Sequence, residues 1–176
     1  EKSGVDLACK LLNSGRIVQS IDPTLLFSGD YWRSVSQKPT ENLPDHFILY
    51  YPIQNTDFSL DVIMRVKKET GLSCIALDGG IKKNPHASMQ IRSYGPCEFL
   101  WLIDHADYII TNSFHGTVLS LLLKKQVIVY RHSTRNSRLE SVLNLLDLNE
   151  IQISEIENLK KLNWKLVAEK ENRIDK

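Results

Sequence analysis

Continuous apolar runs alternate along this chain with segments in which apolar residues recur every three or four positions. The runs at 47–51, 73–77, 107–111 and 126–130 have the length of strands, and they lack the polar alternation of a half-exposed strand. Helical spacing is found at 1–12, 31–35, 60–70, 97–105, 114–124 and 138–146. Strands separated by single helices predict an α/β fold, a doubly wound parallel sheet of about five or six strands with helices on both faces.

Shorter signals predict the boundaries of these elements. A further strand is expected at 17–21, and Pro23 would end it because proline cannot donate to a strand ladder. Asp30 is expected to cap the short helix that follows, and Asp57 or Ser59 the next one. The segment 79–96 carries glycine and proline and is the least regular part of the chain.

The pattern indicates one α/β domain over residues 1–153. The tail, residues 154–176, is charged and helical in pattern. Its Trp164, Leu166 and Val167 predict that it docks, either on this domain or on a domain outside the sequence.

Composition narrows the class of protein. A chain of 176 residues with 42% hydrophobic residues is long enough to bury a full core. The net charge of +1 and the absence of a basic stripe give no reason to expect nucleic acid. Cys9, Cys74 and Cys97 form no Cys-x-x-Cys pair, which argues for a reduced cytoplasmic protein and against a zinc site. Without an apolar run of about 20 residues, we expect at most peripheral contact with the inner face of a membrane.

Candidate chemistry gathers in the stretch 107–117, where an apolar strand runs directly into a helix. Such junctions lie at the carboxyl edge of a parallel sheet, where α/β proteins bind ligands. Asn112 or Ser113 can cap the helix, and its free N–H groups suit a phosphate or carboxylate. His115 in the first turn titrates near neutrality. A simple cap and a structural histidine would explain the same residues, so the pattern leaves both interpretations open.

Arginines follow the strand at 126–130, and their guanidinium groups could bind an anion above His115. Arg135 and Arg138 are the main candidates, and Arg131 is a weaker one. In the alternative interpretation, Arg138 begins a helix and pairs with Glu140 or Glu150. Of the other polar residues, His132 is a secondary candidate at the same edge, Arg92 is a weaker one, and structural or solvated roles suffice for His46, His86 and His105.

Several segments together resemble the polysaccharide pyruvyl transferase family. The resemblance rests on 95–100, on Ala106-Asp-Tyr-Ile-Ile-Thr-Asn-Ser-Phe-His-Gly-Thr117, on Asp22-Pro-Thr-Leu-Leu26 and on 135–143, and it covers roughly residues 1–148. Two departures are Cys97, where an acidic residue is common, and a helix that ends at Lys124-Lys125 without the usual Gly or Pro.

The resemblance implies a fold and an activity. The family has two Rossmann-like domains that face each other across a cleft, as in GT-B glycosyltransferases, and this chain resembles the C-terminal one. Its enzymes move a pyruvyl group from phosphoenolpyruvate to a sugar, free or lipid-linked, as a ketal in bacterial cell-surface or exopolysaccharide synthesis. No carboxylate or Cys/His cluster has the spacing of metal ligands, so we expect no metal, and we expect no cofactor besides phosphoenolpyruvate as the donor substrate. His115 becomes the expected catalytic acid or phosphate ligand, and the residues expected to bind substrate are Asn112, Ser113, Gly116, Thr117, Arg135 and Arg138.

Two other functions fit the same pattern. One is a GT-B-type glycosyltransferase domain in which His115 holds the diphosphate of a nucleotide-sugar. The other is a non-catalytic α/β module that binds a partner protein. Because the chain starts within a helix and without Met, we expect it to lack an N-terminal domain, and to fold without turnover when isolated. We also expect an apolar patch near residues 1–12.

Overall fold

A six-stranded parallel sheet forms the centre of the computed structural model, which describes residues 2–13, 15–79, 83–134 and 136–161. The strand order is β3-β2-β1-β4-β5-β6, and every neighbouring pair is parallel. The strands are β1 (Phe47–Tyr51), β2 (Ser73–Ala76), β3 (Met89–Gln90), β4 (Tyr108–Thr111), β5 (Gln126–Tyr130) and β6 (Gln152–Ile153). The order reverses direction between β1 and β4, which makes their carboxyl ends the switch point where such sheets bind ligands.

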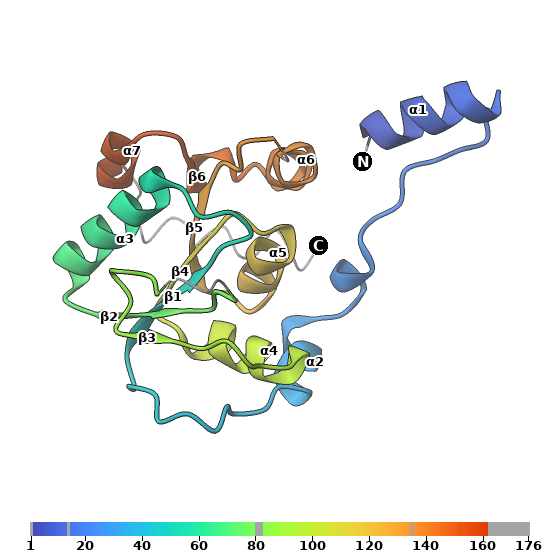
Figure 1. The fold of residues 1–176 in the computed structure, drawn as a ribbon. Coiled ribbons are helices and arrows are strands. Elements are labelled where there is room, and N and C mark those ends of the chain that lie inside the picture. Colours follow the sequence, from blue (N-terminus) through green and yellow to red (C-terminus); the bar gives the residue numbers. More distant parts are fainter. Residues whose placement is uncertain (1, 14, 80–82, 135, 162–176) are drawn as a thin grey trace.

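Helices cover both faces of the sheet (Figure 1). One face carries α3 (Asp57–Thr70) and α7 (Ile156–Lys161). The other carries α2 (Gly29–Ser34), α4 (Pro96–His105), α5 (Phe114–Leu122) and α6 (Ser137–Leu146). Short 3₁₀ turns, η1 (Pro23–Leu26) and η2 (Asn149–Ile151), complete the described elements together with α1 (Lys2–Leu12).

The strands divide their side chains between two cores. In β1, Phe47 and Leu49 join the core under α4, α5 and α6, whereas Ile48 and Tyr50 join the core under α3. The same alternation continues in β4 and β5, and nearly all of these side chains are fully buried. Burial on both sides explains why the strands read as continuous apolar runs, and it confirms the predicted doubly covered parallel sheet.

The N-terminal segment differs from the prediction. Residues 17–21 form no strand; they are part of an extended strap that links α1 to η1 and runs apart from the sheet (Figure 1). Val18 is 82% exposed. Its apolar side chain was therefore misleading as a sign of a buried strand. The prediction also missed β3 and β6, because two-residue strands are too short to show a period.

Helix α1 stands away from the body of the domain (Figure 1). Leu7, Leu11 and Leu12 are mostly exposed, which agrees with the expected apolar patch at this end of the chain. The predicted docking of Trp164, Leu166 and Val167 lies outside the described residues, and the division at residue 153 stays a prediction.

The residues that cap α2 and α3 differ from those predicted. Ser28, not Asp30, caps α2, and Thr56 caps α3 through a reciprocal pair with Ser59. At the end of α5, Lys124 takes a left-handed φ of 59°, the conformation that glycine usually adopts there. A lysine therefore occupies the left-handed position of this turn.

Helix α2 is held tightly against the carboxyl end of α5. Arg33 donates from Nη2 to the carbonyl of Leu123 at 2.8 Å and from Nε to Asp104 at 3.1 Å. A Cβ on Gly29 would lie 2.2 Å from the carbonyl oxygen of Leu122. Only a glycine lets the two helices approach so closely.

We therefore predict that Gly29→Ala destabilises the protein, although alanine favours helix. Relieving a clash with backbone should cost about 1–3 kcal/mol. Gly15→Ala is the matched control, because a Cβ there meets nothing within 4 Å. Urea unfolding should show a lowered midpoint for Gly29→Ala alone, and equal midpoints for the two variants would contradict this packing.

Candidate functional site

The first turn of α5 is seated on the switch point between β1 and β4. Tyr51 pairs with Thr111 at the carboxyl ends of these strands, and the Thr111 hydroxyl donates to the Tyr51 carbonyl at 2.6 Å. The same hydroxyl accepts the Ser113 N–H at 3.0 Å. A Cβ on Gly116 would lie 2.8 Å from Thr111 Oγ1 and 3.0 Å from the Tyr51 ring, so the close seat requires glycine.

The first turn presents free backbone donors. Ser113 caps α5 by accepting the Gly116 N–H at 3.2 Å. The N–H groups of Phe114 and His115 precede the helical ladder and find no acceptor within the described part of the chain. They carry the partial positive charge of the helix terminus and suit an anion.

Asn112 has a different role from the predicted one. Its Oδ1 accepts the Ile53 N–H at 2.8 Å, and its Nδ2 donates to the Gln54 carbonyl at 3.1 Å. The side chain therefore joins the end of β4 to the loop after β1. Asn112 borders the site, but these bonds occupy its amide group and make it mainly a structural residue.

Gln54 extends this support to the neighbouring strand. Its carbonyl also accepts the Tyr130 hydroxyl at 2.9 Å, while its side chain exchanges hydrogen bonds with Ser133. The Tyr130 and Tyr50 hydroxyls lie 3.3 Å apart beneath the loop. Burial raises the pKa of both phenols, so they act as neutral hydrogen-bonding groups.

A cavity of about 420 Å³ opens above the first turn of α5. Its lining combines apolar side chains with one arginine and two histidines and, among the described residues, includes no carboxylate. The lining residues are Ile53, Asn112, Ser113, Phe114, His115, His132, Thr134, Ser137, Arg138 and Leu139. The side chain of His115 is 53% exposed, so it opens to this edge and is not packed among the leucines of α5.

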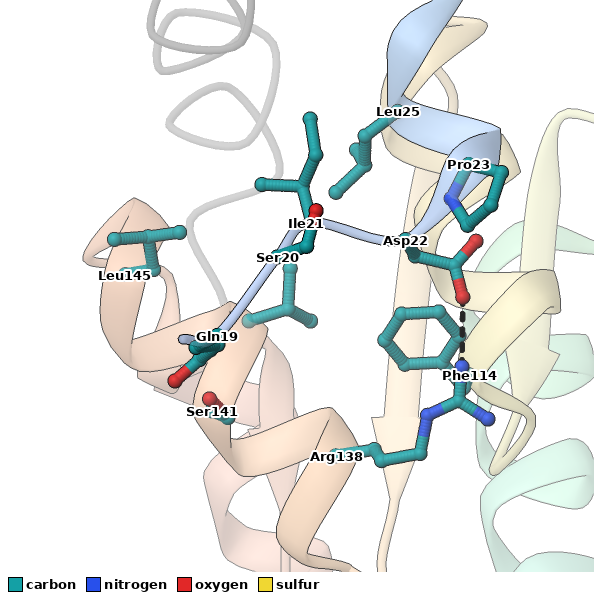
Figure 2. Close-up of a pocket in the computed structure, with 11 residues that line it drawn as sticks. Gln19, Ser20, Ile21, Asp22, Pro23, Leu25, Phe114, Arg138, Ser141 and Leu145 are labelled. Carbon is teal, nitrogen blue, oxygen red and sulfur yellow. Dashed lines mark hydrogen bonds and ion pairs between the residues drawn. The ribbon is translucent and has the colours of Figure 1, made fainter. Parts of the chain in front are cut away.

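Asp22 reaches the same place from the strap. Its Oδ2 lies 2.7 Å from Arg138 Nη2 and 3.9 Å from His115 Nε2. Figure 2 shows the Asp22–Arg138 pair beside the Phe114 ring, and the Arg138 Cζ lies 4.1 Å from the centre of that ring. The pair also lies at the border of a second cavity of about 280 Å³ between the strap and α6 (Figure 2).

The environment of Asp22 sets its charge. Partial burial acts to raise the pKa of this carboxyl group, but hydrogen bonds from Thr24 and the charges of His115 and Arg138 outweigh it and hold the pKa below its ordinary value. Asp22 is therefore an anion at neutral pH.

The structure brings together only some of the predicted residues. His115, Ser113 and Arg138 border the cavity, as predicted. Gly116 and Thr117 are buried behind it, and the Thr117 hydroxyl donates to the Ser113 carbonyl at 2.9 Å, so the expectation that Thr117 lines the depression was wrong. Arg135 lies outside the described residues. His132 does line the cavity.

Other polar residues have local partners. Arg138 pairs with Asp22 and not with a glutamate of α6 or its vicinity, whereas Arg131 pairs with Glu140. His105 stacks on Trp101 at a 3.8 Å centroid distance, in a structural role as expected. Asp22 is the functional candidate that the sequence reasoning did not single out, although its Asp-Pro-Thr motif was one of the signals.

The described residues contain neither a metal-binding cluster nor a membrane-spanning helix. Within them, His, Cys, Asp and Glu form no group of three that could hold a metal ion. In that same part of the chain, each helix is too short or too polar to cross a membrane.

Comparison with known sequences gives one family. A model of the polysaccharide pyruvyl transferase family matches residues 1–134 of the 176. The match includes Asp22 and His115 and ends before Arg138. No curated protein shows significant similarity to the chain.

Three solved structures show some similarity to the chain. The glycotransferase of kitacinnamycin has a TM-score of 0.52 and 12% identity, and the match covers 79% of this chain and 40% of that one. The glycosyltransferase SnogD from Streptomyces nogalater has a TM-score of 0.46 and 14% identity, with 80% of this chain and 43% of that one covered. The UDP-GlcNAc 2-epimerase of Methanocaldococcus jannaschii, in complex with UDP-GlcNAc and UDP, has a TM-score of 0.41 and 18% identity, with 68% of this chain and 36% of that one covered. The chain spans less than half the length of each. The first of these likenesses supports the predicted fold, a Rossmann-like domain of GT-B type.

Asp22 gives the site a predictable pH dependence. A carboxyl group whose pKa is lower in the folded state stabilises that state above its unfolded pKa, here near the ordinary 3.8. This contribution is lost as the pH falls through the folded value. Asp22→Asn keeps an acceptor for Thr24 but removes the charge. We predict that it lowers the free energy of unfolding above about pH 5. The difference in unfolding free energy from wild type should shrink once the pH falls below the ordinary pKa of 3.8.

Urea unfolding between pH 3 and pH 7 measures this difference. Glu69→Gln is the control, because Glu69 pairs with Arg65 on the exposed side of α3 and should change stability by less than about 1 kcal/mol throughout. A difference for Asp22→Asn that is constant with pH would contradict the assigned charge.

Proposed function

The chain belongs to the polysaccharide pyruvyl transferase family, and we propose that it carries the donor site of an enzyme that transfers a pyruvyl group from phosphoenolpyruvate to a sugar. The observation that carries this proposal is the position of His115. Its exposed ring shares one cavity with Arg138 and the free N–H groups of α5, at the switch point of the sheet. The product would be a ketal on a cell-surface or exopolysaccharide unit, with the acceptor free or lipid-linked.

The charges of the cavity match the donor. Phosphoenolpyruvate carries a phosphate and a carboxylate, and both need cationic or N–H partners. The N–H groups of Phe114 and His115 offer one anion site, and the guanidinium group of Arg138 offers a second. The described lining residues include no carboxylate; Asp22 lies at the border, where Arg138 pairs with its charge.

The reaction needs a proton at the terminal carbon of the donor. In the proposed mechanism, protonated His115 gives its proton to the methylene carbon of phosphoenolpyruvate, and the adjacent carbon becomes electrophilic. A sugar hydroxyl adds to that carbon. The bond between this carbon and the bridging phosphate oxygen then breaks, and a second sugar hydroxyl adds to the same carbon to close the ketal. Of the two hydroxyl protons released, one restores His115 and one leaves with the phosphate.

The acceptor is expected to approach from a second domain. The chain spans less than half of the structurally similar glycosyltransferases, and two-domain enzymes of this fold hold their substrates in the cleft between domains. We therefore propose that residues 1–176 bind the donor without turnover, and that an N-terminal domain completes the site.

Two substitutions separate the possible roles of His115. In the full-length enzyme, His115→Ala should leave the melting temperature within a few degrees of wild type and lower kcat at least about 100-fold, the scale of a general acid. His115→Gln keeps a hydrogen-bond donor but cannot transfer a proton, so it should be equally slow.

His46→Gln is the control, because His46 lies exposed at the opposite end of β1 and pairs only with Asp107 among the described residues. Phosphate release from phosphoenolpyruvate with a sugar acceptor measures all three variants. Near-normal turnover of His115→Gln with loss in His115→Ala would mean that the ring only binds the phosphate. Near-normal turnover of both would remove His115 from the site.

A further inference from the structure

Three segments that are distant in the sequence meet at one carboxylate oxygen. Asp22 belongs to the strap before η1, His115 to the first turn of α5, and Arg138 to the first turn of α6. The Oδ2 atom of Asp22 lies 2.7 Å from Arg138 Nη2 and 3.9 Å from His115 Nε2. The other oxygen, Oδ1, accepts the Thr24 N–H at 3.0 Å.

The carboxylate is held in a defined orientation. Its side chain is only 16% exposed, and Pro23 directly after it begins the 3₁₀ turn, which Asp22 caps by accepting the Thr24 N–H. Arg138 is held on its other side by the Phe114 ring, 4.1 Å below the guanidinium carbon (Figure 2). The strap thus presents a negative charge to Arg138 and His115 at the proposed donor cavity.

We propose that Asp22 is a positioning residue for the proposed transfer, which pairs with Arg138 and with protonated His115 and keeps both directed at the donor. The proposal rests on the proposed function. Arg138 has five N–H donors in its planar group and gives one to Asp22; the others have no hydrogen-bond partner among the described residues and can bind an anion in a set direction. The same carboxylate lies 3.9 Å from His115 Nε2 and can orient the ring.

Two other roles for Asp22 fit less well. As a general base for the sugar hydroxyl it would need a free oxygen and an affinity for protons, yet both oxygens have partners and its pKa is lowered. As a simple cap of η1 it would need only an acceptor for Thr24, which an asparagine also supplies. Asp22→Asn therefore separates the cap from the charge.

The kinetic test uses Asp22→Asn in the full-length enzyme. We expect kcat to fall about tenfold or more. The KM for phosphoenolpyruvate should stay constant or fall, because the substitution removes a negative charge beside an anion site. Asp30→Asn is the matched control, since Asp30 also pairs with an arginine, Arg33 at 3.0 Å, but is 92% exposed and remote from the cavity. An unchanged kcat in Asp22→Asn would overturn the proposal.

A second readout does not depend on the substrate. Diethyl pyrocarbonate acylates the unprotonated imidazole, and peptide mass spectrometry follows the rate at each histidine separately. Loss of an opposite charge about 4 Å away should speed modification of His115 about fivefold in Asp22→Asn. Asp22→Glu, which retains the charge, should stay close to wild type, as should Asp30→Asn.

The two readouts distinguish failure of this proposal from failure of the proposed function. Faster modification of His115 in Asp22→Asn, with no activity on phosphoenolpyruvate in any variant, would support the ion pair and reject the substrate. Equal modification rates in wild type and Asp22→Asn, each with a normal melting temperature, would overturn the positioning role whatever the substrate is.

Discussion

The close seat of α5 on the edge of β1 and β4 is the constraint on which the site depends. Gly116 brings the first turn within van der Waals contact of Thr111 and Tyr51, and the Thr111 hydroxyl bonds to both the strand before it and the turn after it. This seat aims the free N–H groups of Phe114 and His115 at the switch point of the sheet. Any side chain at position 116 would move the helix terminus, and the proposed anion site with it.

Two further sets of contacts build the walls of the site around this seat. On one side, Asn112 and Gln54 tie the loop after β1 to β4 and, through Tyr130, to β5. On the other, Asp22 draws Arg138 of α6 toward His115. The first set uses neutral, partly buried hydrogen bonds, which hold the frame at any pH near neutrality. The second uses charges at the border of the cavity, which respond to a ligand.

Much of the fold could be predicted, because buried strands such as β1 and β5 carry uninterrupted apolar runs. The strap at 17–21 contains apolar residues of the same kind, and only the absence of a neighbouring strand distinguishes it. The exposure of His115 followed from its small polar neighbours. Asp22 was not predictable as a partner of Arg138, since 116 positions separate them and only the folded chain brings them together. The position of Thr117 was predicted wrongly for a related reason: two residues after His115, the helix already faces the core and not the cavity.

The central claim is that the first turn of α5 binds the anionic donor. The most direct measurement is an NMR titration of the ¹⁵N-labelled chain with phosphoenolpyruvate, with UDP-glucose in a parallel series. The account predicts that the amide signals of Phe114, His115 and Gly116 shift with phosphoenolpyruvate, and that the side-chain signals of Arg138 shift with them. Shifts confined to another part of the chain, or shifts of these amides with UDP-glucose alone, would contradict it.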